Sequence, residues 1–311
     1  MNLAVAGASG FVGRALVRRL AAGGHTVLRL VRRPAERPDE LRWYPTSGEV
    51  EQHERLDGME ALVNLAGCNL AGGLWTPARR EAIRRSRVEA TRNLVAVATH
   101  LNHRPRVLVS ASAVGYYGSR GDAWLTEASP HGAGFLAEVC RDWEAEARIA
   151  EDLGVRVVRL RLGVVLGAGG GMLGRLQPLF RAGLGGRLGH GRQWMSWISL
   201  DDLLGVIERA LSDEGLRGPV NAVAPQPVRN AEFTAALAAA VRRPAWFRAP
   251  AWALRLGLQD LADELLLSSA RVRPQRLLDL GFSFRHPTLA EALDSAIHPR
   301  PGEPGAPAPG R

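Results

Sequence analysis

The chain has 311 residues and a formal net charge of +9, and all 40 of its basic residues are arginine, because the sequence contains no lysine. No apolar run reaches the ~18 residues of a membrane-spanning helix, and the N-terminus lacks the basic segment of a signal peptide. The two cysteines, Cys68 and Cys140, have no metal-ligand spacing. We therefore expect a cytoplasmic protein with no membrane partner, disulfide or metal. The arginines are scattered and accompany many Ala, Gly, Leu and Pro residues, so the charge does not indicate nucleic-acid binding.

Strand and helix patterns alternate through the first half of the chain. Short apolar runs, typical of buried parallel strands, are separated by longer segments with helical periodicity. Strands are predicted at 2–6, 26–31, 61–65, 106–110 and 155–160, with a weaker extended segment at 41–44, and helices at 13–22, 77–101 and 135–153. This order predicts an α/β fold, a Rossmann-type doubly wound parallel sheet with helices on both faces.

The alternation ends after Gly163, and a small mixed α/β region follows. Extended segments are predicted at 194–198 and 220–223, and helices at 172–182, 199–211, 231–241, 251–267, 274–280 and 288–297. We assign a Rossmann domain to 1–165 and a substrate-binding C-terminal region, interleaved with the first, to 166–298. The Pro/Gly-rich tail at 299–311 is expected to be disordered.

A glycine-rich loop, Gly7-Ala8-Ser9-Gly10-Phe11-Val12-Gly13, lies between the first strand and the first helix. Glycine allows a tight turn and a close approach of the backbone to a pyrophosphate, and the helix N-terminus offers free N–H donors and a positive dipole end. The strand–loop–helix context is the one that a dinucleotide-binding loop requires. The loop therefore predicts dinucleotide binding.

The end of the second strand predicts which dinucleotide is bound. An acidic residue there would bind the ribose 2′-hydroxyl of NAD, but the sequence has Arg32 and Arg33. Arginine suits the 2′-phosphate of NADP, so NADP(H) is the expected cofactor. Leu65, Ala66 and Gly67 end the next buried strand and are expected to lie over the adenosine half of the cofactor.

These segments, together with Ser110-Ala111-Ser112-Ala113-Val114-Gly115-Tyr116-Tyr117-Gly118, resemble the extended short-chain dehydrogenase/reductase superfamily. More narrowly, the chain resembles atypical epimerase-family proteins of that superfamily. The narrower resemblance rests on Trp75-Thr76 with Ser86-Arg87, Phe135-Leu136-Ala137-Glu138 with Trp143-Glu144, Trp194-Met195-Ser196-Trp197-Ile198, and Gly281-Phe282 with Phe284. It implies a Rossmann fold, NADP binding that includes Ser110 and Ala111, and a small C-terminal substrate region.

The catalytic centre departs from the superfamily pattern. A Ser, a Tyr and a Lys four residues after the Tyr usually act together there, and Ser112 matches the first by position. Phe135 and Val139 stand where the Tyr and Lys are expected, and no lysine exists elsewhere to replace the missing one. Tyr117 is a candidate proton carrier, although a phenol with a pKa near 10 is a poor base at neutral pH without a neighbouring cation.

Trp75, Arg87 and Trp194 are the candidate substrate-binding residues, although a tryptophan at such positions can equally belong to the core. Two functions follow from the sequence. One is an NADP(H)-dependent oxidoreductase, epimerase or dehydratase acting on a small molecule. The other is a non-catalytic NADP(H) sensor, which the missing Tyr/Lys pair favours. A monomer and a homodimer both fit the sequence.

Overall fold

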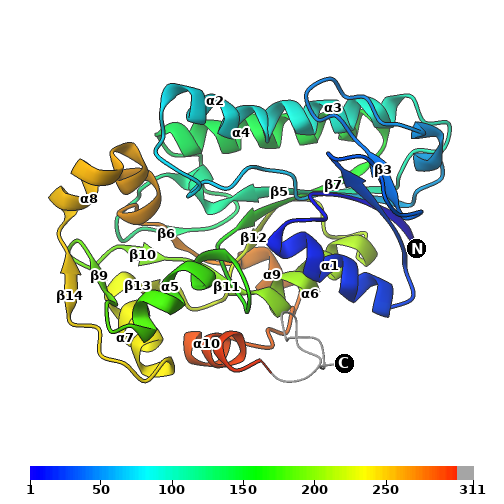
Figure 1. The fold of residues 1–311 in the computed structure, drawn as a ribbon. Coiled ribbons are helices and arrows are strands. Elements are labelled where there is room, and N and C mark those ends of the chain that lie inside the picture. Colours follow the sequence, from blue (N-terminus) through cyan, green and yellow to red (C-terminus); the bar gives the residue numbers. More distant parts are fainter. Residues whose placement is uncertain (300–311) are drawn as a thin grey trace. The chain divides into compact units, whose positions relative to one another are not determined.

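The computed structural model describes residues 1–299 (Figure 1). The chain forms two compact units, each assembled from separate segments of sequence. The first contains Met1–Ser112, Val139–Leu160 and Val206–Pro219, and the second contains Ala113–Glu138, Arg161–Gly205 and the chain from Val220 onward. Segments of both units therefore cross the boundary expected at residue 165. The tail expected at 299–311 lies, apart from its first residue, outside the described residues.

A seven-stranded sheet in the order β12-β7-β5-β4-β1-β2-β3 forms the framework of the first unit. Its strands are β1 (Asn2–Ala6), β2 (Thr26–Val31), β3 (Glu40–Arg42), β4 (Ala61–Asn64), β5 (Val107–Ala113), β7 (Arg156–Leu162) and β12 (Gly218–Ala222). β1 pairs in parallel with β2 and β4, β2 with β3, and β4 with β5. The predicted Rossmann-type sheet is confirmed.

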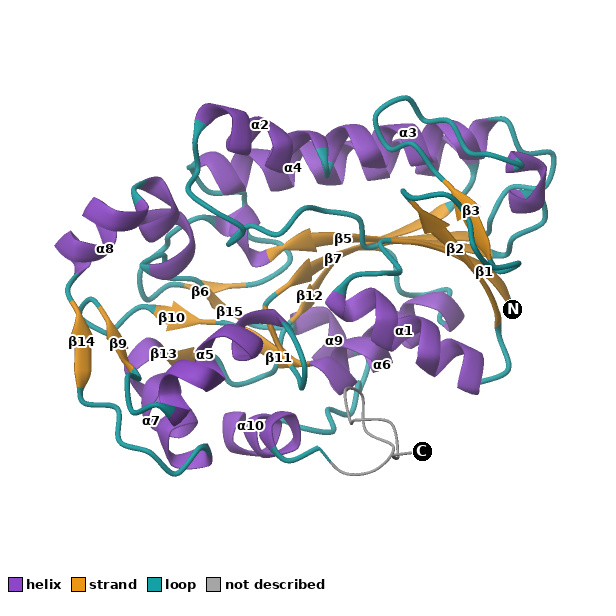
Figure 2. Cartoon of the chain, in the orientation of Figure 1, coloured by secondary structure: helices purple, strands orange, loops and turns teal. Residues whose placement is uncertain are grey.

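Helices cover both faces of this sheet, with α2, α3 and α4 along one face and α1 on the other (Figure 2). They are α1 (Phe11–Ala22), α2 (Pro77–Arg85), α3 (Val88–Thr99), α4 (Phe135–Arg148) and α6 (Leu200–Ser212), with 3-10 turns at His53–Leu56, Val114–Tyr117 and Ile149–Leu153. The apolar core between the sheet and α3 includes Leu62, Leu94, Val95 and Leu108.

The single helix expected at 77–101 is instead two helices, because the chain breaks at Ser86 and Arg87. The Ser86 hydroxyl donates to the Ile83 carbonyl and accepts the N–H of Cys68. Such local side-chain bonds compete with the continuing helix, and here they also tie α2 to the loop after β4.

The second unit is made of short strands and helices. Its strands are β6 (Trp124–Leu125), β8 (Val164–Leu166), β9 (Gly186–Leu188), β10 (Trp194–Met195), β11 (Trp197–Ser199), β13 (Val228–Arg229), β14 (Phe247–Ala249) and β15 (Arg271–Val272). Its helices are α5 (Gly171–Arg181), α7 (Asn230–Ala240), α8 (Ala251–Leu258), α9 (Gln275–Asp279) and α10 (Leu289–Ile297), with a π-helical segment at Ala262–Leu266. The strands form two-stranded pairs.

The core of the second unit contains Trp197, Phe233, Leu237 and Leu293, from β11, α7 and α10. The helix expected at 251–267 stops at Leu258, because Gln259 adopts a left-handed φ of 51° that no helix accommodates. Within residues 1–299, no helix has the length and apolar character needed to cross a membrane.

Candidate functional site

The glycine loop closes tightly between β1 and α1. Gly7 has a φ of +79°, and a Cβ atom there would lie 2.6 Å from the backbone of Leu65. A Cβ on Gly13 would lie 2.2 Å from the Gly7 carbonyl oxygen, and the Gly10 N–H donates to that same oxygen at 2.9 Å. Glycine is required at both positions, because any side chain would push the loop away from the helix.

The N-terminus of α1 fits an anionic ligand. Among residues 1–299, no side chain caps this end of the helix, and no acidic residue lies in its first turn. The N–H groups there are therefore available to an anion, and the helix dipole favours negative charge. Ser9 and Gly10 are exposed beside them, so the residues present fit the pyrophosphate of a dinucleotide.

The two arginines after β2 have different surroundings. Arg33 forms a bidentate ion pair with Glu40, from Nη2 to Oε1 at 2.8 Å and from Nη1 to Oε2 at 3.0 Å. Arg32 is exposed, and among residues 1–299 its guanidinium has no partner. Of the two, Arg32 is therefore the one whose charge is free for a ligand.

Glu40 is a buried carboxylate, only 2% exposed, on the strand next to β2. Burial alone would raise its pKa, but the Glu36 N–H and the Arg33 guanidinium outweigh burial and hold the pKa of Glu40 below its ordinary value. Arg29 adds a second cation 3.6 Å away. The Glu40 carboxylate is thus already neutralised by protein cations, so it is not a free acid of the kind that binds an NAD ribose.

A buried hydrogen-bond chain holds the loop after β4. Asn64 donates to the Thr91 hydroxyl at 2.7 Å, and the Trp143 indole donates to the same hydroxyl at 2.8 Å. The Asn64 side-chain oxygen accepts the Ala66 N–H at 3.1 Å. The chain links α3 and α4 to Leu65–Gly67, the segment predicted to lie over adenosine, and fixes its backbone.

Arg87, which was predicted to bind substrate, instead contacts the loop after β4 through its guanidinium group. Its Nη2 donates to the Cys68 carbonyl at 2.9 Å, and a Cβ on Gly67 would lie 3.2 Å from its guanidinium carbon. The guanidinium also lies over the Trp143 ring at 5.5 Å. These contacts favour positioning of the cofactor loop over substrate contact.

The two predicted substrate-binding tryptophans differ in exposure. Trp75 is 4% exposed, and its indole donates to the Leu70 carbonyl at 2.9 Å, which closes the loop before α2. Trp194 is half-buried in the second unit, between the guanidinium groups of Arg229 and Arg271 at 4.5 and 4.2 Å. The Trp194 indole N–H donates to Asp122 Oδ1 at 2.7 Å, whereas Trp75 has the surroundings of a core residue.

Ser112 lies at the end of β5 and donates its hydroxyl proton to Glu144 Oε1 at 2.8 Å. Both residues are buried, with Ser112 1% and Glu144 5% exposed. Ser110, two residues earlier, makes a long contact of 3.4 Å with the Ala111 carbonyl. Sequence reasoning did not select Glu144 as a functional residue, although the Trp143-Glu144 pair was among the motifs that carried the resemblance.

The start of α4 is held by a carboxylate from the C-terminal part of the chain. Glu264 accepts the N–H of Phe135 at 2.8 Å and that of Leu136 at 3.1 Å. A carboxylate that accepts two N–H groups at a helix N-terminus stabilises that end. Glu264 therefore places an acidic side chain beside the backbone of Phe135 that the sequence did not reveal.

Tyr117 lies in a buried polar network of the second unit. Its hydroxyl donates to Asn221 Oδ1 at 2.7 Å and accepts from Arg161 Nη1 at 2.9 Å. Burial is the main cause that raises the pKa of Tyr117 to about 12, although Arg161 opposes the shift. A fully enclosed phenol that holds its proton so firmly has the properties of a structural group, and these contacts favour that role over proton transfer.

Comparison with known proteins places the chain in a family. The profile of the NAD dependent epimerase/dehydratase family matches residues 3–222, and that of a domain of unknown function, DUF1731, matches residues 249–296. Epimerase family protein MT2273 of Mycobacterium tuberculosis is 46% identical over 300 residues, covering 96% of this chain and 98% of the relative. Human epimerase family protein SDR39U1 is 35% identical and is covered completely. The crystal structure of the human protein with NADPH superposes with a TM-score of 0.88 at 33% identity, covering 96% of this chain and 100% of that chain.

Proposed function

The chain belongs to the NAD dependent epimerase/dehydratase family, and on that premise we propose that it is an NADP(H)-dependent oxidoreductase, epimerase or dehydratase acting on a small molecule. The observation that supports NADP(H) as the cofactor is the different pairing of the two arginines after β2. Arg33 neutralises the buried Glu40, while Arg32 has no ion-pair partner in the described part of the chain. The human relative, whose structure contains NADPH, supports the same choice.

The residues that would hold the cofactor come from the ends of four strands of one sheet, β1, β2, β4 and β5. The Gly7–Gly13 loop and the N-terminus of α1 bind the pyrophosphate, and Arg32 binds the 2′-phosphate. Leu65, Ala66 and Gly67 lie along the adenosine half, and Ser110 and Ala111 complete the site from β5. When bound, the nicotinamide gives or takes a hydride.

Ser112 and Glu144 form the proton route that we assign to the enzyme. The Ser112 hydroxyl already donates to Glu144, so its oxygen is oriented to accept a proton from a substrate hydroxyl. As the substrate proton moves to Ser112 Oγ, the serine proton moves to the Glu144 carboxylate. In the reverse direction, neutral Glu144 returns a proton through Ser112 to a substrate oxygen. The pair thus supplies the acid–base function that Phe135 and Val139 cannot.

The second candidate function is an NADP(H) sensor without catalysis. Phe135 and Val139 in place of the usual Tyr and Lys favour it, as does the burial of the Ser112 side chain. In this reading the Ser112–Glu144 bond is a structural link between β5 and α4.

One experiment separates the two functions. NADPH binding is measured by fluorescence, and a broad panel of aldehydes and ketones is then screened for loss of the nicotinamide absorbance band. The enzyme requires turnover that Ser112→Ala and Glu144→Gln each abolish while NADPH affinity is kept. Glu151→Gln, which changes an exposed carboxylate on the segment after α4, is the matched control and should turn over normally. Tight NADPH binding with no turnover on the whole panel favours the sensor over an oxidoreductase, whereas an epimerase or dehydratase regenerates its cofactor and is detected by product formation.

A further inference from the structure

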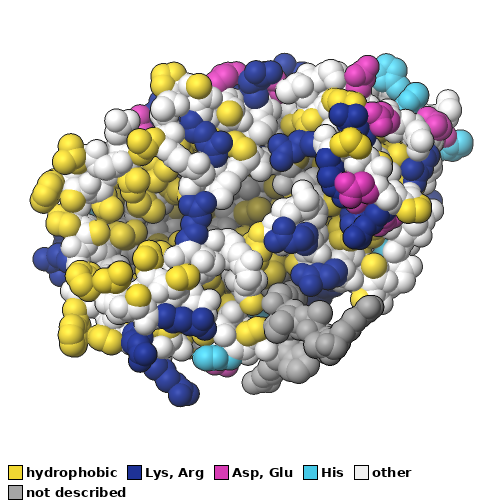
Figure 3. Space-filling view, in the orientation of Figure 1, with side chains coloured by type: hydrophobic (Ala, Val, Ile, Leu, Met, Phe, Trp, Pro, Cys, Tyr) yellow, Lys and Arg dark blue, Asp and Glu magenta, His cyan; other side chains and the backbone are white. Residues whose placement is uncertain are grey.

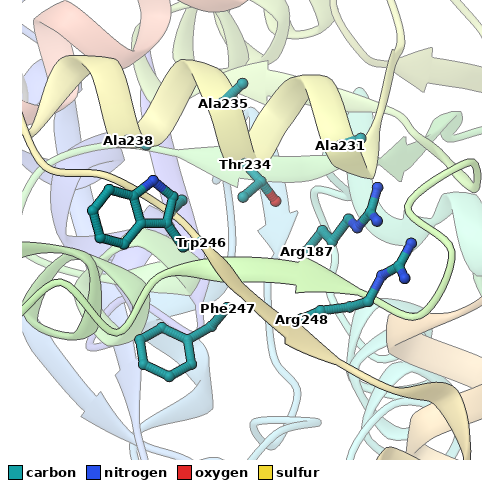
Figure 4. A pocket seen from close by; sticks show the side chains of 9 residues that line it. Arg187, Ala231, Thr234, Ala235, Ala238, Trp246, Phe247 and Arg248 are labelled. Atoms are coloured by element: carbon teal, nitrogen blue, oxygen red, sulfur yellow. The ribbon is translucent and has the colours of Figure 1, made fainter.

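A pocket of about 610 Å³ lies within the second unit, between α7, β9 and β14 (Figure 4). Its volume is in the range of small-molecule sites, which is about 300–1,000 Å³. None of its lining residues belongs to the glycine loop or to the Ser112–Glu144 pair.

One end of the pocket carries two arginines. Arg187 of β9 and Arg248 of β14 are directly paired in the register of these parallel strands, and both line the pocket. Within residues 1–299, neither guanidinium has an ion-pair or hydrogen-bond partner. Like charges on paired residues of neighbouring strands repel each other. An anion between the two guanidinium groups would remove that repulsion.

A third polar group points into the same space. Thr234 of α7 is 6% exposed, and its hydroxyl has no hydrogen-bond partner among the described residues. Figure 4 shows this hydroxyl directed into the pocket, between the arginines and Trp246. The hydroxyl oxygen is accessible from the pocket, so it can donate to or accept from a bound ligand.

The other end of the pocket is apolar. Trp246 and Phe247 lie there with alanines of α7, and the small alanine side chains leave the space open. Trp246 is 88% and Phe247 57% exposed. Figure 3 shows apolar side chains gathered over β14 and α8, so this end of the pocket opens onto an apolar surface.

From these observations we infer that the pocket binds an amphiphilic phosphate, a small molecule with a phosphate group at Arg187, Arg248 and Thr234 and an apolar body against Trp246 and Phe247. A phosphate monoester carries about −1.5 to −2 charges at neutral pH and matches two guanidinium groups. A carboxylate carries one charge and neutralises only one of the two guanidinium groups. Planar guanidinium groups also bind phosphate oxygens in a bidentate manner.

Isothermal titration calorimetry with octyl phosphate tests the inference, and inorganic phosphate and 1-octanol represent the head group and the body alone. We expect octyl phosphate to bind more tightly than either. Arg187→Gln and Arg248→Gln should each weaken binding about tenfold or more, because each removes charge-assisted hydrogen bonds. Thr234→Val, which keeps the side-chain shape, should weaken it severalfold. Arg120→Gln, at an exposed arginine of the same unit that does not line the pocket, should not change it.

Ala235→Phe keeps both arginines and fills the pocket from an exposed position of α7. It should abolish octyl phosphate binding while thermal unfolding and NADPH binding stay unchanged, which separates loss of the site from loss of the fold. Equal affinity for 1-octanol, or unchanged affinity in both arginine variants, would overturn the inference. If inorganic phosphate bound as tightly as octyl phosphate, the proposed apolar contact with Trp246 and Phe247 would be refuted. Sedimentation with phosphatidic acid vesicles but no binding of octyl phosphate would assign the surface to a membrane instead.

Discussion

Replacing Arg32 by Ala is expected to lower NADPH affinity about 10- to 100-fold and to leave NADH affinity within about threefold. A hydrogen bond to a charged group contributes about 1.5–3 kcal/mol, and every 1.4 kcal/mol is about a tenfold change in affinity. The guanidinium of Arg32 has no partner to release among the described residues, so its interaction with the 2′-phosphate is not offset by a broken ion pair.

Arg33→Ala is the matched comparison, because it removes the same charge one residue later. Both N–H groups that Arg33 directs at Glu40 are already used, so NADPH affinity should fall by no more than about threefold. The variant should instead unfold at a lower temperature, since the buried Glu40 loses its bidentate partner.

Fluorescence titration with NADPH and with NADH at ~0.1 M salt measures the change in affinity for each nucleotide in both variants. The Debye length falls from about 10 Å at that salt to about 3 Å at 1 M, and Arg32 is exposed. The preference for NADPH should therefore narrow at high salt in the wild-type protein and change little in Arg32→Ala. Equal losses for the two nucleotides in Arg32→Ala, or a larger loss of NADPH affinity in Arg33→Ala, would refute the assignment.

Three further changes test the rest of the site. Gly13→Ala places a Cβ 2.2 Å from a loop carbonyl and should lower the free energy of unfolding by about 1–3 kcal/mol and abolish NADPH binding. Gly174→Ala, inside α5 with open space around it, should instead raise the free energy of unfolding by about 0.5–1 kcal/mol. Urea unfolding measures the stability of both variants. Ser112→Ala and Glu144→Gln should each lower kcat about 100-fold or more with NADPH affinity unchanged, and a normal kcat in either would remove the proton route. The pKa of Tyr117 rises from 10.0 in the unfolded chain to about 12 in the folded protein. The protonated phenol therefore stabilises the fold below pH ~10, and this stabilisation, on the order of 2–3 kcal/mol, is lost as the pH rises towards ~12. In Tyr117→Phe, the free energy of unfolding should fall less between pH ~10 and pH ~12. A Tyr117 phenol that titrates near pH 10 in the folded protein would contradict its burial in the polar network.

The glycine loop and the missing Tyr/Lys pair could be recognised without coordinates. The loop depends on glycine spacing between an apolar strand and a helix, and each of these signals is local in the chain. The absence of every lysine is a property of composition. The break of the expected 77–101 helix was not visible, because it depends on the Cys68 N–H that reaches Ser86 from another loop.

The sequence by itself determined the parallel α/β sheet, the dinucleotide loop and the absence of any lysine, since periodicity, glycine spacing and composition can be read without long-range contacts. Only the tertiary structure decided which arginine is free: Arg33, which follows β2, pairs with Glu40 of β3, the register partner of Arg29. Likewise, only the packing of α4 brought Glu144 to Ser112 across 32 positions of sequence. Side-chain pairing between distant segments depends on strand register and helix rotation, which no local pattern specifies.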